Sequence, residues 1–356
     1  MSLRKLFSLC ALVALCAFFL TPQPAVSAAE GPTLMSGGPL TFGPDNVLFI
    51  ADNSGAKIVA LELGDRVTGG TPGTKDVPGI DQKIAALLGT DAREIQINDL
   101  AVSPTSSNAF ISVSRGRGAN ATPVLLRVDG AGKIDVISLA DVTYTPASLP
   151  NPPDANPGAR RNPRASSITD MAYVDGQLFI AGLSNEEFSS KLRSVAYPFS
   201  TVSEGTSVEI WHAAHGAFET RSPVYTFVPY KIGGEQNLIA GYLCTPLVKF
   251  PIDNLQPGAK VMGTTIAELG NRNRPLDMIV YQKDGKDYLL MSNTSRGVMK
   301  IPTEHFGHQA GLTEPVPDGN QAGISYETIA QMTGVEQLDL LDDDHVIVIA
   351  RNEAGQ

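Results

Sequence analysis

The sequence has 356 residues, of which 42% are hydrophobic and only 18% are charged, with 34 glycines and 25 prolines. This composition is typical of many short strands and turns and argues against a protein built of long helices. The formal net charge is −10, and an acidic chain of this kind argues against a nucleic-acid-binding role.

Residues 1–28 have the pattern of a secretory signal peptide. Arg4 and Lys5 form a basic start, Leu6–Leu20 is apolar, and Val26–Ala28 supplies small residues for cleavage. The apolar run of about 15 residues is shorter than the ~20 residues that a membrane-spanning helix needs. The sequence therefore predicts a periplasmic or secreted protein with no transmembrane segment after cleavage. Only Cys244 remains beyond residue 28, which excludes an intrachain disulfide in the processed chain.

The segment Leu40–Leu63 reads as three short antiparallel strands. Gly43–Asn46 has turn residues, Val47–Ala51 is a continuous apolar run, and the residues from Ile58 onward alternate as in a half-buried strand. A three-stranded meander cannot bury both of its faces alone. It therefore needs similar neighbours.

The same pattern recurs along the chain about six times, at a spacing of roughly 40–60 residues. The units begin near Leu40, Asn98, Thr169, Val224, Leu276 and Gln337. This repeat predicts an all-β fold, a six-bladed β-propeller formed by residues 29–356 as a single domain. The last unit lacks a third strand, so either Gly31–Ser36 completes that blade or the sequence is truncated.

Two segments interrupt the repeat. In the insertion 64–96, Ile80, Ile84, Leu87 and Leu88 have helical spacing, which predicts a short helix over Asp81–Leu88 that packs against the propeller. Residues 146–163 are rich in proline and asparagine, which predicts neither strand nor helix. A loop of this length is usually functional, and we interpret it as a cover over one mouth of the propeller.

Polar side chains stand at the heads of the predicted first strands, which line the channel of a propeller. These residues are Asn98, Asp99, Asp170, Asp277 and Gln337. Converging carboxylates repel each other unless a cation or hydrogen-bond donors lie between them. The arginines that precede two of these aspartates, Arg164, Arg272 and Arg274, are candidate donors. The aspartates either form a cation or polar-ligand site on the axis, or each caps its own blade by binding local backbone amides.

Four of the five histidines occur in two His-x-x-His pairs, His212 with His215 and His305 with His308. Neutral imidazoles are common ligands of transition metals. No acidic or cysteine ligand accompanies either pair at a characteristic spacing, so polar loop residues are the alternative. Cys244 has no base beside it in the sequence, and we interpret it as a packing residue.

Four stretches of the sequence resemble known propeller families. Leu40–Leu63 resembles the blades of NHL-type and gluconolactonase/paraoxonase-type propellers. Asn98–Val102 is similar to the Asn-Asp-(Val/Ile)-Ala strand of calcium-dependent lactonases, Arg274–Met278 to their Arg-Pro-Asp-Gly-Met stretch, and Glu30–Pro32 to their Glu-Gly-Pro. In those enzymes Glu, Asn and Asp coordinate a calcium ion that polarises a lactone carbonyl. The resemblance implies calcium as a possible cofactor, although Leu276 rather than proline precedes Asp277 here.

Two functions from different classes remain open. The first is a non-catalytic recognition module that binds a small molecule or a protein partner at one channel mouth. The second is a calcium-dependent lactonase or esterase. The most specific hypothesis is that Asp99, Asp170 and Asp277 hold a cation on the axis, with Asn98 and Gln337 as neutral oxygen donors.

Overall fold

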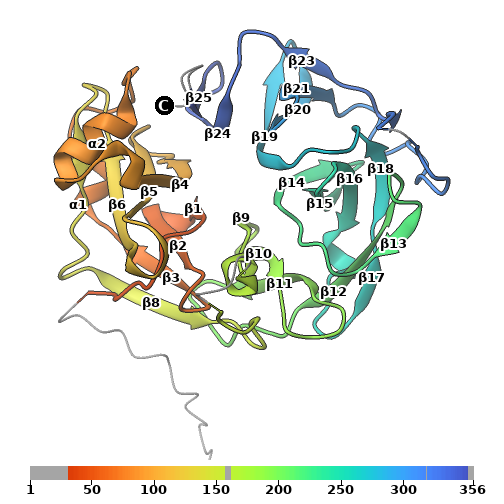
Figure 1. Cartoon of the computed structure of the whole chain (residues 1–356), viewed down its shortest axis with the longest axis horizontal. Helices are drawn as coiled ribbons and strands as arrows, with labels where there is room; N and C mark the ends of the chain where they lie inside the picture. The colour runs from red at the N-terminus through yellow and green to blue at the C-terminus, as the bar shows by residue number, and fades with distance from the viewer. Residues whose placement is uncertain (1–30, 157–161, 318, 352–356) are drawn as a thin grey trace, which may run out of the picture.

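The strands form six sheets arranged around a central axis, as Figure 1 shows. The structure is a computed structural model that describes residues 31–351 apart from 157–161 and 318. The proposed leader and Glu30 lie outside the described residues. The prediction of an all-β propeller is confirmed, and we name each sheet by its innermost strand.

The sheets of the first half of the chain are each completed by short outer strands. The β1 blade consists of β1 (Leu40–Phe42), β2 (Val47–Asp52), β3 (Lys57–Glu62) and β8 (Thr143–Ser148). The β4 blade consists of β4 (Ile95–Val102), β5 (Ala109–Arg115), β6 (Thr122–Val128) and β7 (Ile134–Val136). The β9 blade consists of β9 (Asp170–Val174), β10 (Gln177–Leu183), β11 (Ser190–Ala196), β12 (Thr206–His212) and β13 (Ala217–Glu219), with β17 (Lys260–Met262) parallel to β12.

The second half of the chain forms two full blades and one small sheet. The β14 blade consists of β14 (Thr226–Ile232), β15 (Glu235–Gly241), β16 (Pro246–Pro251), β18 (Thr264–Glu268) and β22 (Ala322–Gly323). The β19 blade consists of β19 (Pro275–Lys283), β20 (Lys286–Asn293), β21 (Gly297–Pro302) and β23 (Glu327–Ile329). The β24 sheet consists of β24 (Val335–Leu340) and β25 (Val346–Ala350).

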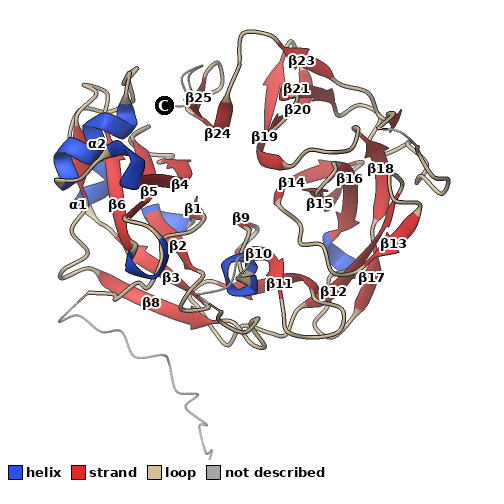
Figure 2. Cartoon of the chain, in the orientation of Figure 1, coloured by secondary structure: helices blue, strands red, loops and turns tan. Residues whose placement is uncertain are grey.

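Helices are few among the described residues, as Figure 2 shows. The α-helices are α1 (Asp65–Thr68) and α2 (Ile80–Leu88). Short 3₁₀ turns occupy Pro44–Asn46, Ala92–Glu94, Gly118–Asn120, Pro163–Ser166 and Ile252–Asn254. Within the described part of the chain, no helix is long and apolar enough to cross a membrane.

The predicted count of six blades is wrong, because among the described residues five sheets have four or more strands and the β24 sheet has only two. The lead-in segment does not complete it. The amides of Met35 and Ser36 both donate hydrogen bonds of 2.9 Å to the buried carboxylate of Asp52 at the end of β2. This carboxylate fixes the lead-in segment to the β1 blade.

The blades do not follow one another in chain order around the ring. The inner strands contact each other in the order β4, β1, β9, β14, β19, β24 and back to β4 (Figure 1). The chain therefore builds β1–β3, forms the β4 blade on one side, returns to add β8 to the outer edge of the β1 blade, and continues with β9 on the other side. Two separate segments make up the β1 blade.

Strand β8 corrects the expectation that the proline-rich segment 146–163 contains no strand. Pro146 lies within β8 and pairs with Val59 of β3. Proline has no N–H to donate. Because β8 is the outermost strand of its blade, no further strand on its outer side needs that donor. Arg164, in the 3₁₀ turn that follows the undescribed residues, donates hydrogen bonds to the carbonyls of Pro153 and Ser54. The described parts of this segment thus run beside the β1 blade.

The continuous apolar run of β2 is buried on both faces, because the β1 blade lies between two neighbours. Phe49 faces the β9 blade and contacts the rings of Tyr173, Tyr197 and Phe199 at centroid distances of 5.2–5.8 Å. On the opposite face, Leu48 and Ile50 pack in a cluster with Phe110 of the β4 blade. Side chains that alternate along β2 therefore pack against the blades on both sides, so that this strand connects three blades.

The helices of the insertion 64–96 pack against the β4 and β1 blades. Helix α2 buries Ile84 and Ala85 in the core of this blade, and it ends at Gly89, whose φ of 64° is the left-handed conformation that favours glycine at a helix end. The structure confirms the predicted inserted helix, which begins one residue earlier than expected.

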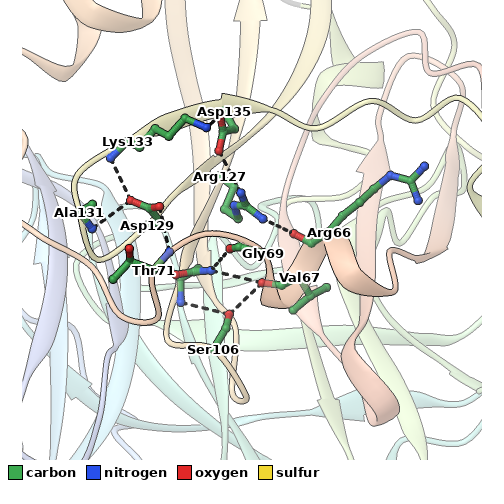
Figure 3. Close-up of polar contacts among 11 residues, drawn as sticks. Arg66, Val67, Gly69, Thr71, Ser106, Arg127, Asp129, Ala131, Lys133 and Asp135 are labelled. Carbon is green, nitrogen blue, oxygen red and sulfur yellow. Dashed lines mark hydrogen bonds and ion pairs between the residues drawn. The ribbon is translucent and has the colours of Figure 1, made fainter.

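Figure 3 shows how polar contacts anchor the first half of this insertion. The amides of Thr71, Ala131 and Lys133 donate to the carboxylate of Asp129. Arg127 donates both to the carbonyl of Arg66 and to Asp135. Hydrogen bonds from the three amides lower the pKa of Asp129, and those from the side chains of Lys133 and Arg127 lower the pKa of Asp135.

Candidate functional site: the axial carboxylates

Four aspartates from four different inner strands line one cavity of about 180 Å³ on the propeller axis. They are Asp99 on β4, Asp170 on β9, Asp277 on β19 and Asp339 on β24. No lysine, arginine or histidine lines this cavity among the described residues. The structure thus brings together the three predicted aspartates and adds a fourth.

Sequence reasoning missed Asp339, although the signal was present. Asp339 follows Gln337 by two residues on β24, and side chains two positions apart in a strand lie on the same face. A polar side chain predicted at Gln337 therefore also placed Asp339 toward the axis.

Each carboxylate binds the inner strand of the next blade. The amides of Leu40, Phe227, Leu338 and Val102 donate to Asp99, Asp170, Asp277 and Asp339, respectively, over distances of 2.6–2.8 Å. The other oxygen of Asp170, Asp277 and Asp339 accepts from the amide of the residue that follows it. Three of the aspartates therefore bind a backbone amide of their own strand, as the capping hypothesis describes, and all four join neighbouring blades.

A shared irregularity aims these side chains at the axis. The pairing of β4, β19 and β24 shifts register just before Asp99, Asp277 and Gln337, respectively. A β-bulge of this kind redirects the side chain that follows it. With its amide nitrogen turned inward, Gln337 donates to Asp99 Oδ1 at 2.8 Å and to Asp277 Oδ2 at 3.1 Å.

The environment of the cavity disfavours negative charge. Burial raises the pKa of Asp170 and of Asp339 to about 6. Burial and the neighbouring carboxylates hold the pKa values of Asp99 and Asp277 well above their ordinary range. Hydrogen bonds from backbone amides oppose these shifts without cancelling them. The cavity therefore takes up protons or another positive charge more readily than exposed carboxylates do.

The donor set does not fit a calcium ion bound directly by all three predicted carboxylates. Direct coordination requires ligand oxygens 2.3–2.6 Å from the ion, and the axial carboxylates do not form a group of three with donor atoms within 4.8 Å of one another. The amide of Gln337 also lies between Asp99 and Asp277. The cavity volume corresponds to roughly six water molecules at ~30 Å³ each, which suits a cation that keeps its water shell.

The other predicted members lie off the cavity. The side-chain amide of Asn98 donates to Ser114 Oγ at 3.0 Å, and Asn98 does not line the cavity. Arg274 is exposed, and its guanidinium lies 5.8 Å from the ring centre of Tyr225. Neither Arg164 nor Arg272 lines the cavity. The arginines therefore do not neutralise the axial carboxylates.

The structure separates the two histidine pairs. His305 is exposed, with Nε2 3.4 Å from Glu304 Oε1. His212 is buried at the end of β12, and its donor atoms lie within 4.8 Å of those of His215 and Cys244. No cysteine accompanies either histidine pair at a characteristic spacing in the sequence. In space, however, the turn between β15 and β16 brings Cys244 to the first pair.

No described residue of the proline-rich segment 146–163 lines the axial cavity. Its role as a cover over one mouth stays a prediction.

Comparisons with known proteins leave the family of this chain open. No protein-family model matches the sequence, and no curated protein matches it either. Solved structures that are similar include a PQQ-bound aldose sugar dehydrogenase from Streptomyces coelicolor, with 12% identity, 94% of each chain covered and a TM-score of 0.31. A periplasmic gluconolactonase from Pseudomonas aeruginosa has 13% identity, with 90% of this chain and 82% of that chain covered and a TM-score of 0.32. A likeness this weak carries no argument about activity, and the propeller assignment rests on the sheet topology.

Proposed function

We propose that this protein is a non-catalytic recognition module, periplasmic or secreted, that holds a small hydrated cation in its axial cavity. The observation that carries the proposal is the set of four half-buried carboxylates around one cavity that no basic side chain lines among the described residues. The partner, a small molecule or a protein, then binds at the channel mouth. The bound cation balances the charge of the axial carboxylates and so helps to hold the inner strands around that mouth in place.

The carboxylates have capacity for such a ligand beyond their bonds to backbone amides. A carboxylate has about four lone-pair sites, and the amides occupy only some of them. Waters around a divalent cation donate hydrogen bonds, so a hydrated ion suits acceptors that are spread around the axis. The positive charge also offsets the repulsion that raises the pKa values of Asp99 and Asp277.

The test is the effect of calcium on thermal unfolding at neutral pH. An ion at about 100 times its dissociation constant stabilises the folded state by about 2.7 kcal/mol, so removal by the calcium-selective chelator EGTA lowers the melting temperature by several degrees. Asp170→Asn abolishes this shift, whereas Asp253→Asn, at an exposed position outside the cavity, retains it. An EGTA shift that persists in Asp170→Asn, or no shift in the wild-type protein, would contradict the proposal.

A calcium-dependent lactonase or esterase is the alternative. Pockets for small organic ligands usually measure about 300–1,000 Å³, which is larger than this cavity, and Asn98 bonds to Ser114 rather than facing the axis. Calcium-dependent hydrolysis of a lactone that disappears in Asp277→Asn would favour the alternative over a non-catalytic role.

A further inference from the structure

A second polar site lies at the junction of the β9 and β14 blades, away from the axial cavity. His212 ends β12, His215 lies three residues later in the turn to β13, and Cys244 lies in the turn between β15 and β16. One ring nitrogen of each histidine and the sulfur of Cys244 lie within 4.8 Å of one another. Two ligands that share an ion at 2.0–2.3 Å are separated by at most about 4.6 Å, so small side-chain adjustments suffice for one ion to contact all three.

The state of His212 points independently to a missing ligand. Its side chain is 1% exposed, and neither ring nitrogen has a hydrogen-bond partner. Buried polar groups in native proteins nearly always have a partner. The ring centre of His215 lies 3.8 Å from that of His212. A neutral imidazole nitrogen without a hydrogen-bond partner offers its lone pair to a metal ion.

The two turns that carry these side chains are held by the last residue of β18 and by the segment that follows this strand. The amide of Ala214, between the two histidines, donates to Glu268 Oε2 at 3.1 Å. The amide of Cys244 donates to the carbonyl of Asn273 at 2.9 Å, and Thr245 Oγ1 donates to the carbonyl of Gly270 at 2.9 Å. The relative position of the imidazoles and the thiol is therefore fixed before any ion binds.

We propose that His212, His215 and Cys244 form a binding site for a thiophilic transition metal ion, with Zn²⁺ as the expected occupant. Two imidazoles and one thiolate are ligands that zinc and copper prefer, and calcium does not. Three protein ligands leave the fourth tetrahedral position of zinc for water, and exposed His215 places that position toward solvent. Binding replaces the thiol proton of Cys244 with a metal–sulfur bond and releases the proton to solvent.

The experiment uses Co²⁺, which substitutes for zinc and gives visible and near-ultraviolet bands when a thiolate binds it. Titration of the purified full chain with Co²⁺ yields a thiolate-to-cobalt band that saturates at one equivalent and is displaced by Zn²⁺. The band disappears in Cys244→Ser and weakens strongly in His215→Ala. Both sites are at least partly accessible, so these variants keep the wild-type circular dichroism spectrum.

Two control variants make the outcome specific. His308→Ala, in the other histidine pair, and Asp170→Asn, in the axial cavity, retain the full cobalt band. Zn²⁺ also protects Cys244 from alkylation in the wild-type protein and fails to protect it in His215→Ala. A missing charge-transfer band, or a band that survives in Cys244→Ser, would overturn the proposal. Displacement of Co²⁺ by Cu²⁺ but not by Zn²⁺ would overturn zinc as the occupant.

Discussion

The substitution Asp170→Asn should change the sign of its effect on stability between acidic and alkaline pH, in the presence of EGTA. Burial raises the folded-state pKa of Asp170 to about 6 from an ordinary value of 3.8. A raised carboxyl pKa means that stability from this group is fully present below the unfolded pKa and is lost as the pH rises through the folded pKa. About 2 pKa units correspond to about 3 kcal/mol, most of which is lost between pH 4 and pH 7.

The asparagine variant cannot ionise and avoids this loss. It keeps an oxygen that accepts from the amide of Phe227, but it turns an NH₂ group toward the amide of Met171. The lost hydrogen bond costs about 1–2 kcal/mol at every pH. We therefore expect the variant to be less stable than wild type near pH 4.5 by about 1 kcal/mol, and more stable near pH 8 by a similar amount.

Urea unfolding, followed through the fluorescence of the single tryptophan Trp211 and through circular dichroism, measures this difference at each pH. The wild-type curve alone is not diagnostic, because Asp339 and Glu268 also have raised pKa values. The difference in unfolding free energy between variant and wild type reports the contribution of Asp170 together with its effect on Asp99 and Asp277. Exposed Asp253→Asn is the matched control. A difference that is the same at both pH values would refute the reasoning.

Three further substitutions test how the ring is held together, each by urea unfolding. Phe49→Ala empties the contact between the β1 and β9 blades and should lower stability by about 3–5 kcal/mol, whereas exposed Phe218→Ala should have little effect; equal effects would contradict this assignment. Asp52→Ala should cost about 2–3 kcal/mol and make the lead-in segment more susceptible to proteolysis, and unchanged cleavage would show that another contact anchors it. Asp339→Ala leaves the amide of Val102 without its acceptor and should cost about 1–3 kcal/mol, so a neutral result would mean that the β24–β4 junction does not depend on this bond.

Local patterns were sufficient to predict the propeller fold and the strands that repeat along it. The buried run of β2 and the inserted helix both follow from the spacing of apolar residues, which the sequence displays directly. The order of the blades depends on which edges pair, and local patterning does not encode this. Strand β8 contains Pro146 and belongs to a blade whose other strands end more than eighty residues earlier, so a reading in chain order placed it in a loop.

The axial site was predictable in part for the same reason. Asp99, Asp170 and Asp277 recur in the inner strands of three blades, and the repeat revealed them. The contact of Gln337 with two carboxylates depends on a side-chain orientation that no spacing encodes. Cys244 approaches His212 only because two blades are adjacent in space. The positions of Cys244 and His212 in the sequence do not indicate this contact.

The small β24 sheet closes the ring by a combination of apolar alternation and one carboxylate. Along β25, Ile347 and Ile349 pack against the β4 blade, whereas Val346 and Val348 pack against the β19 blade. A single strand thus supplies apolar contacts to both neighbours, although its sheet has only two strands. Each of the four carboxylates accepts a hydrogen bond from the inner strand of the next blade, always in the same direction around the ring. Asp339 makes this bond across the junction between β24 and β4. Because only two strands contribute apolar surface there, the polar bond carries a larger share of the closure than at the other junctions.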